Sequence, residues 1–260
     1  MKRMPIGRLG ALALIALAAR SAAQAPAPQA KVIEAQGDAF TADLRPLRAD
    51  QILSFDAIVK LGANASLRFA DPCGDIDLIE GPREGRLGAL IVAEGAPPAG
   101  CKPPADGDAM ARRQLAQLFL DQSPTRVLRG ARTSSGAWDL DMDHPGAACV
   151  ASNTSPLFAG DREALGDSLE VSDLGTGASG LSFFDEAREG WIWPDDVPIH
   201  AAEFRVASKL QSANFRIVIV ESPPPDPAPL ARRFMSAGCT AQALRLLPLL
   251  APDHIVAGSR

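Results

Sequence analysis

Short stretches of alternating polar and apolar residues, each ending at a turn-forming residue, constrain this chain most strongly. Its 260 residues include 22 Gly and 22 Pro, which is typical of a chain with many turns and few long helices. Within residues 31–92, the runs 66–70 and 75–79 alternate and stop at Asp71-Pro72 and Gly81-Pro82. This period of two is typical of strands joined by hairpins. The sequence therefore predicts a mostly-β fold.

Two regions of this kind are expected to form separate β-domains. Residues 31–105 form the first, and the proline pairs at 97–98 and 103–104 mark its end. Residues 130–222 hold about seven short strand-like runs with turn signals between them, which predicts a β-sandwich-like domain. Residues 106–122 lie between the two domains. They predict a connecting helix with an apolar stripe, formed by Met110, Leu115, Leu118 and Phe119.

The last part of the chain, residues 223–260, is expected to be a Pro-rich spacer followed by a helical tail. Residues 223–229 (PPPDPAP) predict an extended segment. Two short helices should follow, separated by Gly238, so that they form a helical hairpin. The leucines between 244 and 250 are expected to pack on the second β-domain.

The first 23 residues predict a secretory signal peptide. A basic start is followed by an uncharged apolar run over 9–19 and then by small residues, with cleavage expected after Ala23. The apolar run is much shorter than the roughly 20 residues of a membrane span. Residues 24–30 are expected to be a disordered spacer. An alanine-rich chain with only five lysines is also typical of GC-rich bacteria. We therefore expect a periplasmic or secreted bacterial protein with no membrane span after cleavage.

The four cysteines are expected to form disulfides. An even number of cysteines in an exported chain favours disulfides over zinc, and no C-x-x-C occurs. Four cysteines allow three connectivities, and the sequence alone does not choose among them. Adjacency along the chain favours Cys73–Cys101 and Cys149–Cys239.

The charge of the mature chain excludes some classes of partner. The whole chain has 26 basic and 31 acidic residues, and the expected signal peptide contains four of the basic ones and no acid. Cleavage therefore leaves 22 basic and 31 acidic residues, a net charge of -9. Nucleic acids and anionic membranes both attract positive charge, so we expect neither as a partner.

The segment 47–87 (LRADQILSFDAIVKLGANASLRFADPCGDIDLIEGPREGRL) has an apolar stretch that ends at Leu61-Gly62, a small-residue turn and a strand over 67–71. In this pattern it resembles the periplasmic β-domain of the FecR-like family. One departure is that the usual Asp-Gly is here Asp71-Pro72-Cys73-Gly74. FecR-like signalling proteins carry a transmembrane helix before this domain, whereas a signal peptide is expected here. The resemblance therefore implies the fold and the compartment, but not transmembrane signalling by this chain.

Two motifs resemble ligand sites, but the residues around them do not fit such sites. Asp139, Asp141 and Asp143 have the spacing of a calcium loop, but His144 stands where that loop needs glycine. Because they alternate with apolar residues, we expect a strand with its carboxylates in water. The glycines of 175–180 match G-x-G-x-x-G, but a strand-like run follows them where a dinucleotide site needs a helix. We expect a loop between strands, and no metal or cofactor.

No catalytic residue is predicted, because the chain contains no G-x-S-x-G, S-x-x-K or H-E-x-x-H motif. Paired carboxylates, as in glycosidases, are an alternative that the acidic residues leave open. These residues are Asp185, Glu186, Glu189, Asp195 and Asp196.

Trp191 and Trp193 are the candidate partner surface. Residues two apart on a strand share one face, so both indoles point the same way. If that face is outward, they can stack on a sugar or a peptide; if it is inward, they belong to the core.

Together these observations predict an exported, non-catalytic binding or accessory protein of the bacterial cell envelope, with ligand sensing as a finer form of that role. The expected partner is a protein or a glycan of the envelope. Two alternatives stay open, a periplasmic hydrolase that uses acidic residues and a structural envelope component.

Overall fold

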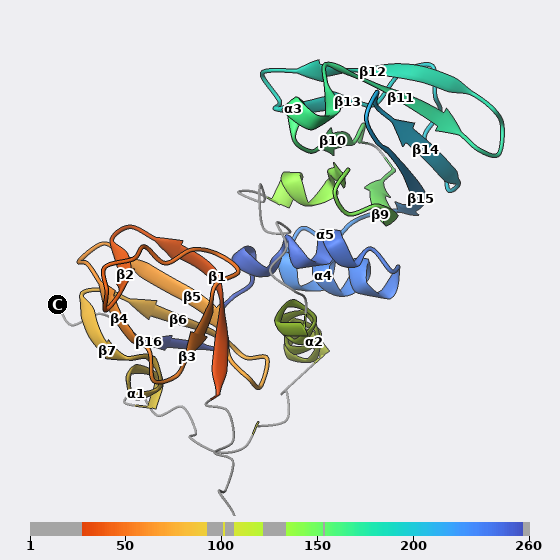
Figure 1. Cartoon of the computed structure of the whole chain (residues 1–260). Coiled ribbons are helices and arrows are strands. Elements are labelled where there is room, and N and C mark those ends of the chain that lie inside the picture. The colour runs from red at the N-terminus through yellow and green to blue at the C-terminus, as the bar shows by residue number, and fades with distance from the viewer. Residues whose placement is uncertain (1–27, 93–100, 102–106, 122–133, 153, 257–260) are drawn as a thin grey trace, which may run out of the picture.

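The computed structural model describes residues 28–92, 101, 107–121, 134–152 and 154–256. Two β-regions lie at opposite ends of the molecule, with helices between them (Figure 1). Strands outweigh helices in the described residues, so the mostly-β prediction is confirmed. The expected signal peptide and the first four residues of the expected spacer lie outside the described residues. No helix in the described part of the chain is long and apolar enough to cross a membrane.

The first β-region, as far as it is described, contains a five-stranded and a three-stranded sheet. Neighbouring strands are antiparallel, apart from the parallel pair β16 and β6. The larger sheet has the order β16 (His254–Val256), β6 (Ile76–Glu80), β5 (Ser66–Ala70), β1 (Gln29–Gln36) and β3 (Ile52–Ser54). The smaller sheet consists of β2 (Ala39–Thr41), β4 (Ile58–Leu61) and β7 (Arg83–Arg86), and the short helix α1 (Leu87–Val92) follows.

The five-stranded sheet is buried on both faces, and successive residues of its strands point to opposite faces. In β1, Ala30 and Val32 belong to the apolar cluster shared with the three-stranded sheet. Ile33 belongs to a different cluster, formed with the helices on the other side. In β5, Leu67 and Phe69 likewise face the first cluster. Because β1 begins at Gln29, the expected spacer ends two residues earlier than predicted.

The second β-region is an eight-stranded sheet within the described residues. Its edge strands, β8 and β9, follow each other in the sequence, and every strand contributes to one apolar cluster. The sheet is therefore curled almost into a barrel, so that the two layers of the expected sandwich are halves of one sheet. Its order is β8 (Leu140–Asp141), β10 (Leu157–Ala159), β13 (Gly190–Ile192), β12 (Ser179–Asp185), β11 (Ser168–Asp173), β14 (Glu203–Ala207), β15 (Ser212–Val220) and β9 (Gly146–Ala151). The short helix α3 (Arg162–Leu165) lies between β10 and β11.

Helices form the layer between the two regions (Figure 1). They are α2 (Gly107–Asp121), α4 (Pro227–Ser236), α5 (Thr240–Leu244) and the 3-10 turns η2 (Ser134–Trp138) and η3 (Leu247–Leu249). One apolar cluster unites them with the first sheet through Ile76 and with the second through Val220. The predicted connecting helix is confirmed to within a residue at each end. Its buried face differs from the predicted stripe, because Met110 and Leu118 are exposed and Ala111 and Ala116 are buried.

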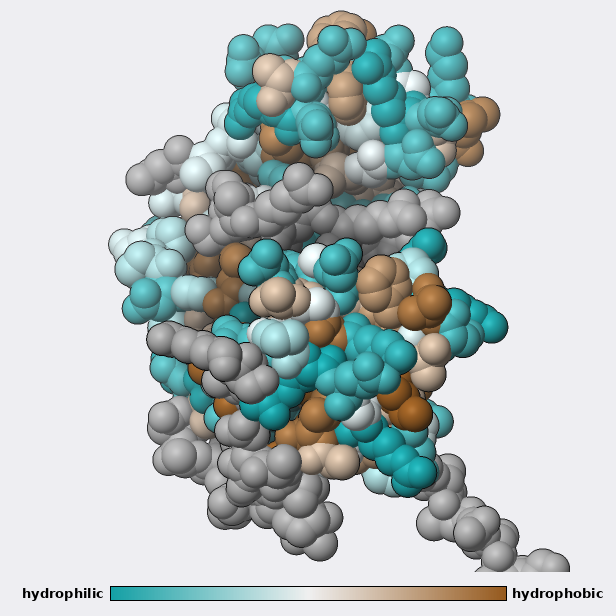
Figure 2. All heavy atoms as spheres, turned by 90° about the vertical axis from the view of Figure 1, so that its left-hand side faces the viewer, coloured by the Kyte–Doolittle hydropathy of each residue, from teal (hydrophilic) through white to brown (hydrophobic). Residues whose placement is uncertain are grey.

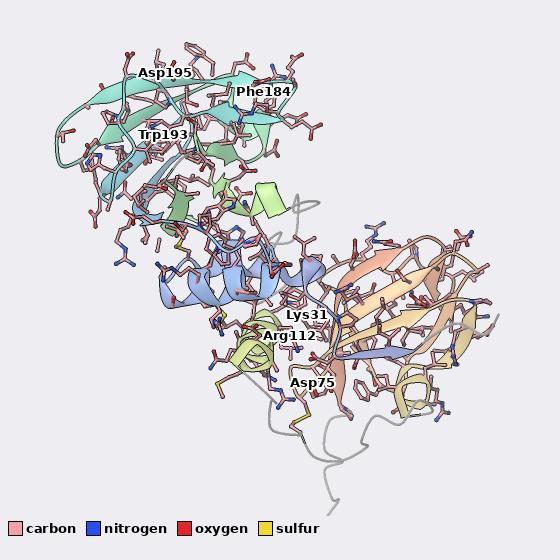
Figure 3. All side chains as sticks on the ribbon, turned by 180° about the vertical axis from the view of Figure 1, so that it is seen from behind. Lys31, Asp75, Arg112, Phe184, Trp193 and Asp195 are labelled. Carbon is pink, nitrogen blue, oxygen red and sulfur yellow. A yellow bond between two sulfur atoms is a disulfide. The ribbon has the colours of Figure 1, made fainter. Side chains whose placement is uncertain are left out.

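Charged side chains also join α2 to the first sheet (Figure 3). Lys31 is 2% exposed, and its Nζ donates a hydrogen bond of 2.7 Å to the carbonyl oxygen of Phe119. The same Nζ lies 3.6 Å from Asp50 and 4.2 Å from the centre of the Phe119 ring. A cation near the last carbonyls of a helix is favourable, because the helix dipole is negative there. Arg113 pairs with Asp75 at the same interface.

The C-terminal tail was expected to pack on the second β-domain, but it also joins the first sheet. Its helices pack between the regions, but β16 continues to the first sheet and pairs with β6. Asp253 anchors it, because its N–H donates to the oxygen of Ile76 (2.6 Å) and its carboxylate accepts from the N–H of Ile76 (2.9 Å) and from Arg112 (3.0 Å). The predicted extended spacer is also shorter than expected. α4 begins inside it at Pro227, where a proline is tolerated because the first N–H groups of a helix have no partner.

Both predicted disulfides are confirmed. The four cysteines, all among the described residues, form Cys73–Cys101 and Cys149–Cys239, with Cα separations of 5.3 Å and 5.8 Å. The second disulfide joins the edge strand β9 to the start of α5. Gln242 strengthens this junction, because its amide accepts from the N–H of Cys149 (2.5 Å) and donates to the oxygen of the same residue (2.9 Å). A side chain of the tail thus satisfies an edge strand that would otherwise present free backbone groups.

Candidate functional site

The tryptophan pair belongs to the core, so the partner-surface hypothesis is wrong. Trp191 is fully buried and Trp193 is 3% exposed. Trp193 stacks on Phe158 at 5.4 Å, and its indole N–H donates to the oxygen of Val197 (2.7 Å). Both indoles do share one strand face, but the curled sheet turns that face inward. On the face of the molecule shown in Figure 2, small apolar areas alternate with polar ones.

The glycine-rich motif is a turn between β11 and β12, which confirms the loop prediction. The buried carboxylate of Asp173 accepts hydrogen bonds from the hydroxyl of Thr176 (2.6 Å) and from two backbone N–H groups of the turn. The Thr176 hydroxyl and these N–H groups hold the pKa of Asp173 below its usual range. Nε2 of His200 lies 3.3 Å from the same carboxylate, and Nδ1 lies 3.1 Å from the oxygen of Pro198. Both ring nitrogens are engaged, so His200 is not placed to activate a nucleophile.

The three aspartates of 139–143 do not form the water-facing strand that the alternation predicts. β8 ends at Asp141, and the chain turns there. The Asp141 carboxylate lies 2.7 Å from Nη2 of Arg245 and 3.0 Å from Nδ1 of His144, and it accepts from the N–H of Asp143 (2.9 Å). The tail brings a buried guanidinium to this point, which the local pattern does not reveal. Within the described residues, no group of three or more His, Cys, Asp or Glu side chains is placed to hold a metal ion.

Arg245 fixes the backbone around these aspartates. Its side chain is 4% exposed, and its Nη1 donates to the carbonyl oxygens of Asp139 (3.0 Å) and Gly136 (3.4 Å). It therefore holds η2 and β8 from inside the molecule. Burial alone would raise the pKa of Asp141, but Arg245 and the other hydrogen bonds outweigh burial and lower it.

A pocket of about 380 Å³ lies beside Asp139. Burial raises the pKa of Asp139, and Arg245, the backbone N–H of Leu157 and Arg188 offset this only in part. A titratable group that is shifted by burial and lies in a hollow is a candidate functional group. The pocket is lined by Gly136, Trp138, Asp139, Thr154, Ser155, Pro156, Leu157 and Arg188.

The lining groups suit the binding of a small polar molecule. Thr154 and Ser155 are exposed, and the Thr154 hydroxyl donates to the oxygen of Ala151 (3.1 Å), so its lone pairs remain to accept. Trp138 is half-buried and makes a T-shaped contact with the ring of Phe234. Arg188 contributes a guanidinium from the turn after β12. These groups come from three distant segments of the chain.

The five acidic residues considered for hydrolysis do not converge in this pocket. Asp185 accepts a hydrogen bond from the N–H of Ala187 within its own turn (2.9 Å). Glu186 lies 3.3 Å from Arg162. The other three, Glu189, Asp195 and Asp196, are exposed. Among the described lining residues, Asp139 supplies the one carboxyl group. A glycosidase needs two carboxyl groups about 5–9.5 Å apart.

Sequence reasoning missed most of the pocket. The sequence drew attention to Asp139 because it is spaced with Asp141 and Asp143 as in a calcium loop, and not because of a pocket. Thr154, Ser155 and Arg188 carry no local signal, because their role depends on which turns the curled sheet brings together. A second and larger hollow, of about 570 Å³, lies along α4. Its Arg232 already forms a salt bridge with Asp108 (2.9 Å).

Comparison with known proteins reveals no relative of this chain. No protein-family model matches it, and no curated protein or solved structure does.

Proposed function

We propose that this chain is an exported, non-catalytic binding or accessory protein of the bacterial cell envelope, which senses a ligand in the periplasm. The observation that carries the proposal is the pocket beside Asp139. It is lined by both polar and apolar groups, and its wall is held by the buried Arg245. A pocket whose wall is already rigid favours binding, because the protein loses less conformational entropy when the ligand binds.

Two features support export. The first 23 residues have the order of a signal peptide. The four cysteines are paired, and disulfides persist in oxidising compartments such as the bacterial periplasm.

The FecR-like assignment is also part of the proposal. The segment 47–87 that carries the resemblance contains β3 to β7, in both sheets of the first β-region. A Cβ added to Gly62, which ends the apolar stretch, would lie only 3.0 Å from Cβ of Asp38, a closer approach than almost any side chain makes. A structural need for glycine where the pattern has one supports the resemblance.

Hydrolysis is the second candidate, and the raised pKa of Asp139 favours it. A buried carboxyl group that keeps its proton can act as a general acid. Asp141 does not supply the second carboxylate, because it is engaged by Arg245 and His144 and does not line the pocket. We therefore place binding first.

The test begins with export of the full chain from a Gram-negative host. The expected product is found in the periplasm and begins at Gln24, as the intact mass will show. Retention of residues 1–23 on a cytoplasmic product would contradict export.

The purified product is then incubated with a soluble digest of the envelope, and the retained small molecules are identified by mass spectrometry. We expect retention to be lost in Arg188→Gln and kept in Arg205→Gln, which removes the same charge from the outer face of β14. Turnover of a model ester, peptide or glycoside that is lost in Asp139→Asn would establish the hydrolase instead.

A further inference from the structure

Arg188 is the group in the pocket that most needs a partner. Some exposed arginines of the described residues are paired, Arg162 with Asp167 (2.8 Å) and Arg232 with Asp108 (2.9 Å), whereas others, such as Arg205 on the outer face of β14, form no salt bridge and line no pocket of this kind. The Arg188 side chain forms no salt bridge with another residue that the structure describes, although Asp139 is near enough to interact electrostatically. Its backbone is fixed, because its N–H donates to Asp185. An unpaired guanidinium in a hollow is suited to a carboxylate, which it can bind through two parallel hydrogen bonds.

Asp139 and Arg188 both line the pocket but form no salt bridge with each other. Burial raises the pKa of Asp139, and its carboxyl group can hydrogen-bond to a ligand hydroxyl in either protonation state. The other cation nearby, Arg245, is neutralised by Asp141. Arg188 is therefore the cation of the described lining that is left to bind a negatively charged group of a ligand.

The remaining wall indicates what else the ligand carries. Thr154 and Ser155 offer hydroxyl groups, while Trp138 and Leu157 offer apolar surface. Hydroxyl groups beside an indole suit a ring with one apolar face and several hydroxyls of its own. A volume of about 380 Å³ lies near the lower end of the usual range for small-molecule pockets, about 300–1,000 Å³. A ligand of one or two rings fits this size better than a long polymer.

We propose that this pocket binds an acidic sugar, with its carboxylate on Arg188 and its hydroxyls on Thr154, Ser155 and Asp139. The inference rests on the proposed function and names the ligand class of the same site. A sugar acid of the envelope and a free sugar acid share this chemistry, and the site recognises the group common to both.

The experiment uses the full oxidised chain and measures binding by titration calorimetry and ligand-observed NMR. The probes are glucuronate, glucose and acetate. We expect glucuronate to bind at least tenfold more tightly than either of the others, because only glucuronate offers both the carboxylate and the hydroxyl-bearing ring. Arg188→Gln should weaken glucuronate binding about ten- to hundredfold, as expected for a charge-assisted hydrogen bond of about 1.5–3 kcal/mol. Arg205→Gln is the matched control and should bind as the unaltered chain does.

The variant Asp139→Asn distinguishes binding of an acidic sugar through Arg188 from binding of a basic sugar through Asp139. An amide can accept from Leu157 and donate to the sugar, so glucuronate binding should persist in this variant. Glucose or acetate binding as tightly as glucuronate, or full glucuronate binding by Arg188→Gln, would overturn the acidic-sugar assignment. Glucosamine binding that is stronger than glucuronate binding and is lost in Asp139→Asn would overturn it as well. If another small molecule from the envelope digest is retained through Arg188, the sugar assignment fails while the binding function stands.

Discussion

Asp139 and Asp141 lie two residues apart, yet replacing each with asparagine should change stability in opposite directions. Asp141 is 14% exposed and faces the 4% exposed guanidinium of Arg245. Asp141→Asn leaves this buried cation without its counter-charge, which costs about 3–5 kcal/mol for a buried pair. Asp139 is held in the pocket with its charged form disfavoured. Asp139→Asn should therefore stabilise the chain at neutral pH, by less than the roughly 1.4 kcal/mol that each unit of difference between folded and unfolded pKa is worth at a fully buried site, because solvent screens the half-buried Asp139.

The pH dependence gives the same contrast. The folded-state pKa of Asp141 is lowered, so its contribution to stability is present above the unfolded pKa and is lost as pH falls through the folded one. The deficit of Asp141→Asn should therefore shrink in acid. The folded-state pKa of Asp139 is raised, so its neutral form stabilises the fold at low pH and this advantage is lost as pH rises through the folded pKa. The gain in Asp139→Asn should therefore be largest at neutral pH and vanish in acid.

Urea unfolding of the oxidised chain, followed by tryptophan fluorescence at a series of pH values, measures both effects. Asp195→Asn is the control, because Asp195 is exposed and such surface changes stay within about 0.5 kcal/mol. If Asp141→Asn costs no more than this control, or if Asp139→Asn is destabilising at neutral pH, the electrostatic account of this segment is wrong.

Three further changes test other parts of the fold. Gln242→Ala leaves two buried backbone groups of the edge strand unsatisfied and should lower the free energy of unfolding by about 1–3 kcal/mol for each, as urea unfolding will show. Trp193→Ala should cost about 3–5 kcal/mol, because this indole is core; a variant with unchanged stability would refute that placement. Asp253→Ala should release β16, so the amides of β6 should exchange faster with solvent while those of β15 do not.

The features that the sequence predicted well depend on short-range patterns. Alternation and turn residues locate β5 at 66–70 and β6 to within one residue of 75–79, because side chains on a strand alternate between its two faces. The connecting helix follows from its capping and apolar residues. The disulfide connectivity followed from adjacency along the chain, and Cys73–Cys101 and Cys149–Cys239 both join neighbouring cysteines.

The features that the sequence did not predict depend on contacts between distant segments. The orientation of the tryptophan pair is decided by the curl of the sheet, which alternation does not encode. Pairing of β16 with β6 joins residues about 177 positions apart, and three residues of alternation are too short to indicate a strand. The site was missed for the same reason. The electrostatic environment of Asp139 depends on Arg188 and Arg245, which are distant from it in the sequence.

One short segment of the tail controls the geometry of the candidate site. Cys239, Gln242 and Arg245 lie within seven residues, and they hold β9, the Cys149 backbone and the η2–β8 backbone respectively. Nine residues after Arg245, the same tail begins β16, which completes the edge of the first sheet. The pocket wall and the first β-region are therefore attached to one continuous element. A ligand that tightens the pocket would act on a segment whose other end is a strand of the first β-region, and this connection gives the proposed ligand sensing a physical basis.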